Sequence, residues 1–236
     1  TDAQIAAYQV KTGKQRTPAL AAGASVDSFQ IASNIRQMGR VQLLVDVLQR
    51  THRMLNEADG ERFADDFAPY LKGHAGHSAY HMKGEEVAPH LQRIGEFMGR
   101  LLDELQPAYG EEPVYQVLVR VFGEHFRFAE AKVAVKANQE LSASSLQSPD
   151  DLEATYREKR GRGYQGYVAN VTETCDPENE LQLIIKVQAA PNNTDDGQLL
   201  AEALPNLAER TDLDTLYTDG GYGSSGNDQS LADQQI

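Results

Sequence analysis

The sequence predicts an α/β protein with a mixed sheet and a large all-helical insertion after the first strand. Three observations support this prediction. Residues 25–33 alternate apolar and polar side chains, which is typical of a short strand. From residue 34 to about residue 140 the apolar side chains recur at helical spacing instead. Residues 166–175 and 181–190 then return to strand-like patterns on either side of an Asp-Pro turn, so they predict a hairpin.

The helical block contains three apolar segments. In residues 41–55 and 87–105 the apolar side chains lie three or four positions apart, so each set shares one helix face. The third segment begins at Pro113, and proline fits the first turn of a helix because its missing N–H would have no intrahelical partner there. We therefore expect the insertion to comprise residues 34–147 and to be entirely helical.

The rest of the chain completes the sheet. Residues 142–151 form a small polar linker with a Ser-Pro turn. After the hairpin, Thr194 or Asp195 can cap a helix, which Pro205 is expected to shorten or bend. Residues 213–219 have the next strand pattern, and they are apolar enough for a central position in the sheet.

The expected organisation thus has three parts. Residues 1–24 are a lead-in, residues 25–33 and 148–236 are the sheet-containing core, and residues 34–147 are the insertion.

Composition limits the function classes. The chain has 236 residues and a net charge of −13, which argues against a protein that simply coats DNA. A metal-dependent nuclease core remains compatible with this charge, because metal ions offset acidic ligands. Cys175 is the only cysteine, so no internal disulfide or cysteine-based zinc site is expected. No apolar run approaches the ~20 residues of a membrane span, and the polar N-terminus lacks a signal-peptide core, so we expect a cytoplasmic protein.

Two aspartates in strand patterns are the main candidates for chemistry. Asp219 ends the last strand pattern and precedes two glycines, a place where carboxylates face the ligand crevice of an open α/β sheet. Asp27 lies inside an otherwise apolar strand, where an unpaired buried carboxylate would be costly. The simpler interpretations are a turn aspartate and an edge-strand aspartate facing water. Together the two predict a Mg²⁺ or Mn²⁺ site, since Mg²⁺ needs oxygen ligands from few side chains.

The densest basic run is the candidate for nucleic-acid binding. It contains Arg157, Lys159, Arg160 and Arg162, followed by Tyr164. Basic residues interleaved with glycine and tyrosine suit contacts to phosphates and stacking on bases. A solvated charged loop is the alternative in an acidic protein.

Two further groups have simpler interpretations. One is a histidine-rich segment with a glutamate: His74, His77, His81 and Glu85. Its spacing suits zinc on a helix face, but interspersed glycines argue against a continuous helix, so we expect surface histidines. The other is an acidic group: Asp150, Asp151 and Glu153. We expect it to be a helix N-terminus, where negative charge is favourable.

In combination, these motifs resemble the DDE transposases of bacterial insertion sequences. The resembling residues are 26–36, 148–176, 192–196 and 217–222, in an order that covers about residues 25–236. The combination is specific, whereas each motif alone is weak.

The resemblance implies a ribonuclease H-like core in which Asp27 and Asp219 are the first two acids of a catalytic triad. It also implies two-metal phosphodiester chemistry with Mg²⁺ or Mn²⁺ ions ~3.5–4 Å apart. The partners would be DNA, as transposon ends and target, and the protein would be nucleoid-associated when bound. The sequence leaves a homo-oligomer open and gives no reason to expect a membrane partner.

The chain departs from the family pattern at the third acid. That residue is a glutamate on a later helix, but no glutamate follows Glu209, and Asp228 and Asp233 lie too close to Asp219 to replace it. No helix-turn-helix pattern precedes Asp27. We therefore expect an incomplete transposase copy. The alternatives are a non-catalytic remnant that binds DNA or a full-length copy, and a stand-alone metal-dependent nuclease.

Overall fold

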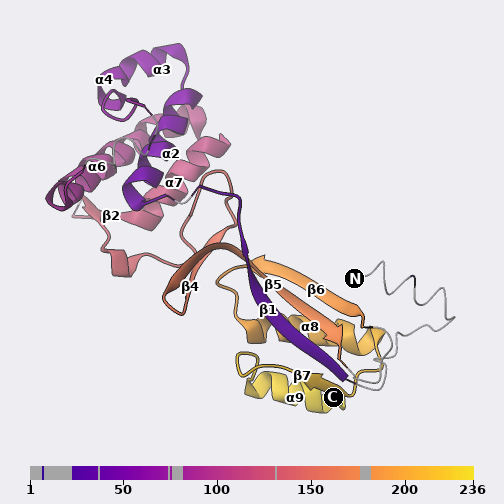
Figure 1. Cartoon of the computed structure of the whole chain (residues 1–236). Helices are drawn as coiled ribbons and strands as arrows, with labels where there is room; N and C mark the ends of the chain where they lie inside the picture. The colour runs from indigo at the N-terminus through magenta and orange to yellow at the C-terminus, as the bar shows by residue number, and fades with distance from the viewer. Residues whose placement is uncertain are drawn as a thin grey trace. The chain divides into compact units, whose positions relative to one another are not determined.

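The structure, a computed structural model, divides the chain into two units (Figure 1). One unit comprises residues 1–32 and 157–236, here called the sheet unit, and the other comprises residues 33–156, here called the inserted unit. The structure describes residues 7, 23–36, 38–73, 75, 82–130, 132–175 and 182–236.

A mixed sheet forms the sheet unit. Strand β1 (Gly23–Ala32) pairs antiparallel with β5 (Arg162–Thr174) and parallel with β7 (Thr215–Tyr217). On its other side β5 pairs with β6 (Ile184–Pro191), again antiparallel, and with β4 (Thr155–Lys159). The prediction of an α/β fold with a mixed sheet is confirmed, and so is the hairpin of β5 and β6.

Two helices follow the hairpin. Helix α8 (Asp196–Arg210) begins where Asp195 accepts hydrogen bonds from the N–H groups of residues 197 and 198, and Pro205 does not interrupt it. Helix α9 (Ser225–Asp233) is capped by Ser224. Apolar side chains of α8 pack against the sheet in two clusters: Ala24, Leu183, Ile185, Ala203, Leu207 and Leu213 in one, and Val26, Leu200, Leu204 and Tyr222 in the other.

The opposite face of the sheet carries exposed apolar side chains. Side chains alternate between faces along a strand, and directly paired residues share a face. Ser25, Phe29 and Ile31 alternate along β1 and therefore share one face of the sheet. Tyr217 pairs with Ser25, so it lies on this face as well. Phe29, Ile31 and Tyr217 are 53, 40 and 60% exposed. In contrast, the alternate residue Val26 is buried against α8.

The inserted unit is mainly helical. Its elements are α2 (Arg40–Met54), α3 (Glu57–Arg62), α4 (Ala64–Phe67), α6 (Gly84–Tyr109), α7 (Pro113–His125), β2 (Phe126–Ala129), β3 (Lys132–Val135) and a 3₁₀ turn, η1 (Asn138–Glu140). Pro113 is the first residue of α7, as predicted. The helices enclose a core whose fully buried members include Leu44, Leu48, Ile94, Met98, Leu101 and Leu118.

Gly95 permits a close contact between α6 and the hairpin of β2 and β3. A Cβ atom at this position would lie 2.6 Å from two atoms of the Phe126 ring and 3.0 Å from Val133. The Phe126 ring itself is buried and also contacts Phe122, with ring centroids 5.5 Å apart. The hairpin is therefore packed firmly on the helical core.

Three sequence-based predictions are wrong. The insertion is not all-helical, because α7 ends at His125 and is followed by the antiparallel strands β2 (Phe126–Ala129) and β3 (Lys132–Val135). The last strand is short and lies at the end of the strand order rather than in the centre. Residues 150–153 do not begin a helix, because Ser148 and Asp151 form an isolated β-bridge there.

Candidate functional site

The two candidate aspartates belong to neighbouring parts of the sheet. Asp27 lies within β1, and β7 pairs parallel with β1 from Gly23 with Thr215 to Ser25 with Tyr217. β7 ends at Tyr217, so Asp219 lies two residues beyond the end of this neighbouring strand. The charges of both aspartates act on the hydroxyl of Tyr222, so both belong to the surroundings of that side chain.

Each carboxylate accepts a hydrogen bond from a backbone N–H close by in the sequence. Oδ1 of Asp27 accepts a hydrogen bond from the N–H of Ser28 (2.8 Å), and Oδ1 of Asp219 accepts one from the N–H of Gly221 (2.8 Å). Both residues are exposed, and within the described parts of the chain neither makes an ion pair with a basic side chain. The glycines after Asp219 are thus part of an Asx-type turn that orients the carboxylate.

A buried tyrosine lies close to these carboxylates. The Tyr222 side chain is 1% exposed, and its hydroxyl lies 3.4 Å from Nδ2 of Asn170, which can donate to it. Burial raises the pKa of Tyr222 to about 12, and the charges of Asp196, Asp219 and Asp27 act in the same direction, against a hydrogen bond with Ser28. Tyr222 therefore remains a neutral phenol beside acidic groups at physiological pH.

Asp196 is the acidic residue that sequence reasoning did not single out. It is 8% exposed, and within the described structure its Oδ1 has no hydrogen-bond partner. Its Oδ2 lies 3.7 Å from Nη2 of Arg157. The point that a Cβ of Gly221 would occupy is 3.5 Å from Oδ2 of Asp196 and 3.0 Å from Oδ1 of Asp219. The only local signal was the pair of adjacent aspartates at the start of a helix.

The acidic groups do not make a complete metal site. No group of three or more His, Cys, Asp or Glu side chains in the described residues is placed to hold a metal ion. Asp27 and Asp219 could together hold one hydrated ion, because Mg²⁺ keeps several water ligands and needs only one or two carboxylates.

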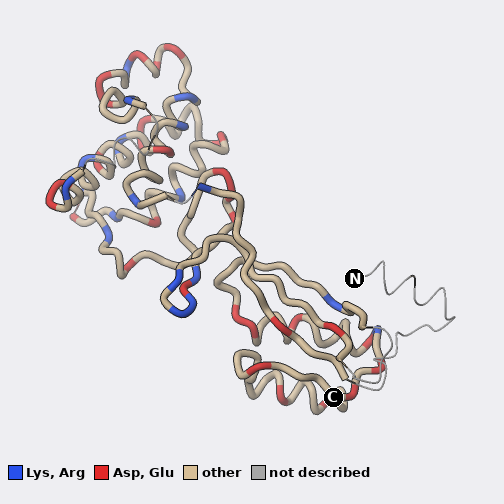
Figure 2. The backbone as a smooth tube through the Cα atoms, viewed as in Figure 1, with Lys and Arg blue, Asp and Glu red and all other residues tan. Residues whose placement is uncertain are grey.

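The basic run forms the hairpin of β4 and β5. Arg160 and Gly161 make its two-residue turn with φ angles of 55° and 75°, the geometry of the turns preferred in such hairpins. Figure 2 shows basic residues gathered at this turn. Lys159, Arg160 and Arg162 are exposed, and the Arg162 guanidinium lies 5.4 Å from the centre of the Tyr164 ring.

Arg157 differs from the other three basic residues. Its Nη1 lies 3.5 Å from the carbonyl oxygens of Asn192 and Thr194, and its Nη2 faces Asp196. Arg157 thus contacts the segment that leads into α8, whereas Lys159, Arg160 and Arg162 are exposed to solvent.

The remaining candidates are dispersed. His74, His77 and His81 lie outside the described residues, and Glu85 is exposed in the first turn of α6. Asp150 forms an ion pair with Arg50 (2.7 Å), and Asp151 accepts a hydrogen bond from the Ser33 hydroxyl (2.5 Å). These contacts give the acidic group a structural role in the inserted unit.

Comparisons with known proteins give no relative. No protein-family model matches the chain. A search of curated proteins and a search of solved structures also find no match. None of the helices in the described parts of the chain has the length and apolar character that crossing a membrane requires.

Proposed function

We propose that the sheet unit is the ribonuclease H-like catalytic core of a DDE-type transposase, which cleaves and transfers DNA strands with Mg²⁺ or Mn²⁺. The observation that carries this proposal is the position of Asp27 within β1 and of Asp219 two residues beyond the end of the neighbouring parallel strand β7. The strand order supports it as well. The antiparallel strands β1, β5 and β6 are followed by α8 and then by β7, which is parallel to β1, as expected for a ribonuclease H-like sheet. The short strand β4, which pairs with β5, is an addition to that order.

In this proposal Asp27 and Asp219 would hold a divalent metal ion that acts on the scissile phosphate. A divalent ion polarises the phosphoryl oxygen and lowers the pKa of a bound water or hydroxyl. Two-metal chemistry requires further ligands to position the second ion in line with the leaving oxygen. With two carboxylates at the site, we expect weak metal binding and negligible strand cleavage by this chain alone.

A metal titration tests the proposal. Mn²⁺ binding, measured by electron paramagnetic resonance, should be lost in Asp27→Asn and in Asp219→Asn. Asp214→Asn is the matched control, because Asp214 is an exposed carboxylate directly before β7. Equal Mn²⁺ binding by all four proteins would refute the assignment. A cleavage assay on duplex DNA completes the test, and strong cleavage that is lost in Asp27→Asn would show that a third ligand exists in this chain.

A non-catalytic DNA-binding role is the second candidate, and the exposed basic hairpin favours it. Each phosphate contact contributes about 0.9 to the slope of log affinity against log salt concentration. Replacing Lys159, Arg160 and Arg162 with alanine should therefore weaken duplex binding and lower this slope by up to about 3. The Arg157→Ala variant is tested separately, because Arg157 also contacts the segment that leads into α8.

The control for the hairpin variant removes the same charge elsewhere. Arg53, Lys72 and Arg93 are exposed basic residues of the inserted unit, and replacing them with alanine keeps the net charge of the two variants equal. If both variants bind DNA alike, the hairpin is not the contact surface.

A further inference from the structure

The inserted unit contains a cavity of about 430 Å³ that lies within this unit alone. It is bordered by the start of α2, the end of α7 and the segment 138–147. This volume falls in the range of small-molecule sites. The polar residues that line it are Arg40, His125, Asn138, Ser142, Ser145, Gln147 and Tyr156. No Asp or Glu is among the described residues of its wall, although the chain carries a net charge of −13.

Arg40 contributes a positive charge that no carboxylate balances in the described structure. Its Nη1 donates to the carbonyl of Lys136 (2.8 Å) and to Oδ1 of Asn138 (3.1 Å), and its Nη2 donates to the carbonyl of His125 (2.8 Å). The buried Nε has no partner among the described residues. These contacts use three of the five N–H donors and hold the guanidinium in one orientation, so the Nε–H, one N–H of Nη2 and the charge are left available.

His125 adds a second donor without a partner. The residue is 4% exposed, and neither ring nitrogen has a hydrogen-bond partner in the described part of the chain. Burial lowers the pKa of His125 to about 4, and the charges of Arg40 and Lys136 act in the same direction. The ring is therefore neutral at pH 7 and carries one N–H. A buried donor left without a partner costs about 1–3 kcal/mol.

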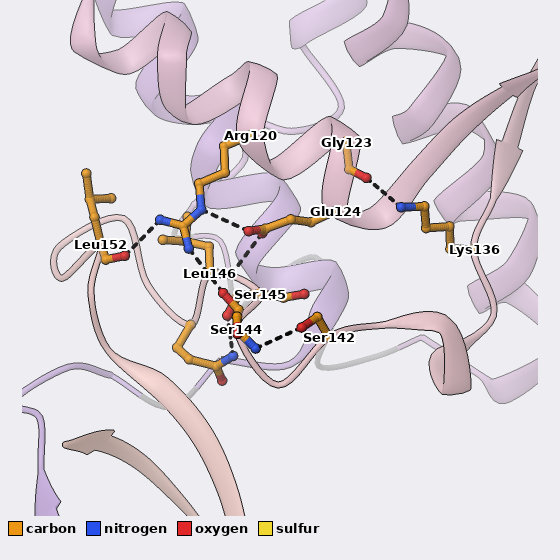
Figure 3. A network of polar contacts seen from close by, with 10 residues as sticks. Arg120, Gly123, Glu124, Lys136, Ser142, Ser144, Ser145, Leu146 and Leu152 are labelled. Carbon is orange, nitrogen blue, oxygen red and sulfur yellow. Dashed lines mark hydrogen bonds and ion pairs between the residues drawn. The ribbon is translucent and has the colours of Figure 1, made fainter. Parts of the chain in front are cut away.

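Ser145 adds a third donor from the facing segment. It is 6% exposed, and its buried hydroxyl has no partner among the described residues. Figure 3 shows how this segment is attached to α7. Nε of Arg120 pairs with Glu124 (2.8 Å), and the other oxygen of Glu124 accepts the N–H of Leu146 (2.8 Å).

The remaining contacts of this segment make its backbone part of a fixed wall. Arg120 also donates to the carbonyls of Ser144 (3.2 Å) and Leu152 (2.8 Å), as Figure 3 shows. The Ser145 carbonyl accepts from Nε2 of Gln147 (2.6 Å). The Ser145 hydroxyl thus has no partner among the described residues, although the backbone on either side of it is bonded to Arg120 and Glu124.

We propose that this cavity binds the phosphate group of a phosphomonoester. A phosphate offers several acceptor oxygens and negative charge, which match three donors without partners and one uncompensated guanidinium. Bidentate geometry suits arginine to phosphate in particular. The three donor atoms belong to residues that line the cavity but are themselves buried, so a phosphate can bond to them only when these side chains move. This proposal is independent of the metal chemistry of the sheet unit.

The test is a titration of the protein with inorganic phosphate, monitored by calorimetry and by ¹H–¹⁵N spectra of the histidine rings. Saturable binding that perturbs His125 is expected. Ser145→Ala should keep its thermal stability, because it removes a hydroxyl that has no partner, and should weaken phosphate binding about two- to tenfold. Arg40→Gln should weaken it further. Arg53→Gln, an exposed position on the same helix α2, is the control that leaves affinity unchanged.

The source of the phosphate is distinguished with two further probes. A deoxynucleoside 5′-monophosphate tests a free nucleotide, and duplex DNA with and without a 5′-phosphate tests a DNA end. Ser145-dependent binding of either probe supports the proposal and identifies the source. The proposal is overturned if inorganic phosphate does not bind saturably, or if it binds Ser145→Ala as tightly as the wild type. If Arg40→Gln does not fold, the Ser145→Ala comparison still decides the question.

Discussion

Replacing Gly95 by alanine tests the packing that holds the β2–β3 hairpin on α6. The new Cβ would lie 2.6 Å from two ring atoms of Phe126, whereas carbon atoms attract best at about 3.5–4.0 Å. Phe126 is 1% exposed, so its ring has no open space to enter. The same hairpin begins directly after His125, so this contact also positions one wall of the cavity.

The expected magnitude comes from two opposing effects. Alanine in place of glycine within a helix stabilises it by about 1 kcal/mol. Overpacking a closed core costs about 1–3 kcal/mol, and a contact with two ring atoms at 2.6 Å favours the upper part of that range. Gly95→Ala should therefore lower the free energy of unfolding by about 1–2 kcal/mol. The melting temperature should fall by about 2–8 °C, since 1 kcal/mol corresponds to about 2–4 °C at this chain length.

Gly123→Ala is the matched control in α7. A Cβ there meets nothing within 4 Å, so only the gain in helix propensity remains, and stability should rise by up to about 1 kcal/mol. Both variants are compared by thermal and urea unfolding followed by circular dichroism. The double variant Gly95→Ala/Phe126→Leu should lose less stability than the two single changes combined, because they relieve one contact. If Gly95→Ala is as stable as Gly123→Ala, the close contact is wrong.

Three further predictions follow from the charged and titratable groups. Mn²⁺ should raise the melting temperature of the wild type but not that of Asp27→Asn, because only a protein that binds the ion gains stability from it. The free energy of unfolding should fall as the pH drops from about 6.5 towards 4, because the pKa of His125 is lowered in the folded state and the unfolded state therefore takes up a proton first. Urea titrations at each pH should show a smaller loss of stability for His125→Phe. Arg157→Met should lower the free energy of unfolding, measured with urea, by about 1–2 kcal/mol, because it leaves Asp196 buried without its partner. Arg160→Met, at the exposed turn, should change it by less than about 0.5 kcal/mol. A cost at Arg160 equal to that at Arg157 would contradict the assigned contact.

Short-range patterns in the sequence were sufficient for most of the secondary structure. The alternation in residues 25–33 predicted β1 to within two residues. The turn predicted at 176–179 lies outside the described residues, but the two strand patterns on either side of it do pair. Pro113 and Asp195 marked helix starts because their local chemistry suits those positions. The β2–β3 hairpin was missed because its first strand continues an apolar helical pattern without a break.

The site required information that a local pattern does not contain. Asp27 and Asp219 could be proposed as partners, but the pairing of β1 with β7, the strand that precedes Asp219, is a contact between distant segments. Asp196 acquires its surroundings from Arg157 and Gly221, which are distant in sequence. The same holds for the cavity, whose unpaired donors come from α2, α7 and a connecting segment.

The position of the inserted unit has a consequence for folding kinetics. β1 and β5 pair across residues 33–156, so the sheet depends on a contact between segments far apart in the chain. Such contacts slow folding, because the intervening chain must first be closed into a loop. Once the inserted unit has folded, the hydrogen bond from Ser33 to Asp151 holds its two ends together and replaces a long loop with a short one. A mutation that destabilises the helical core is therefore expected to slow the formation of a sheet to which that core contributes no strand.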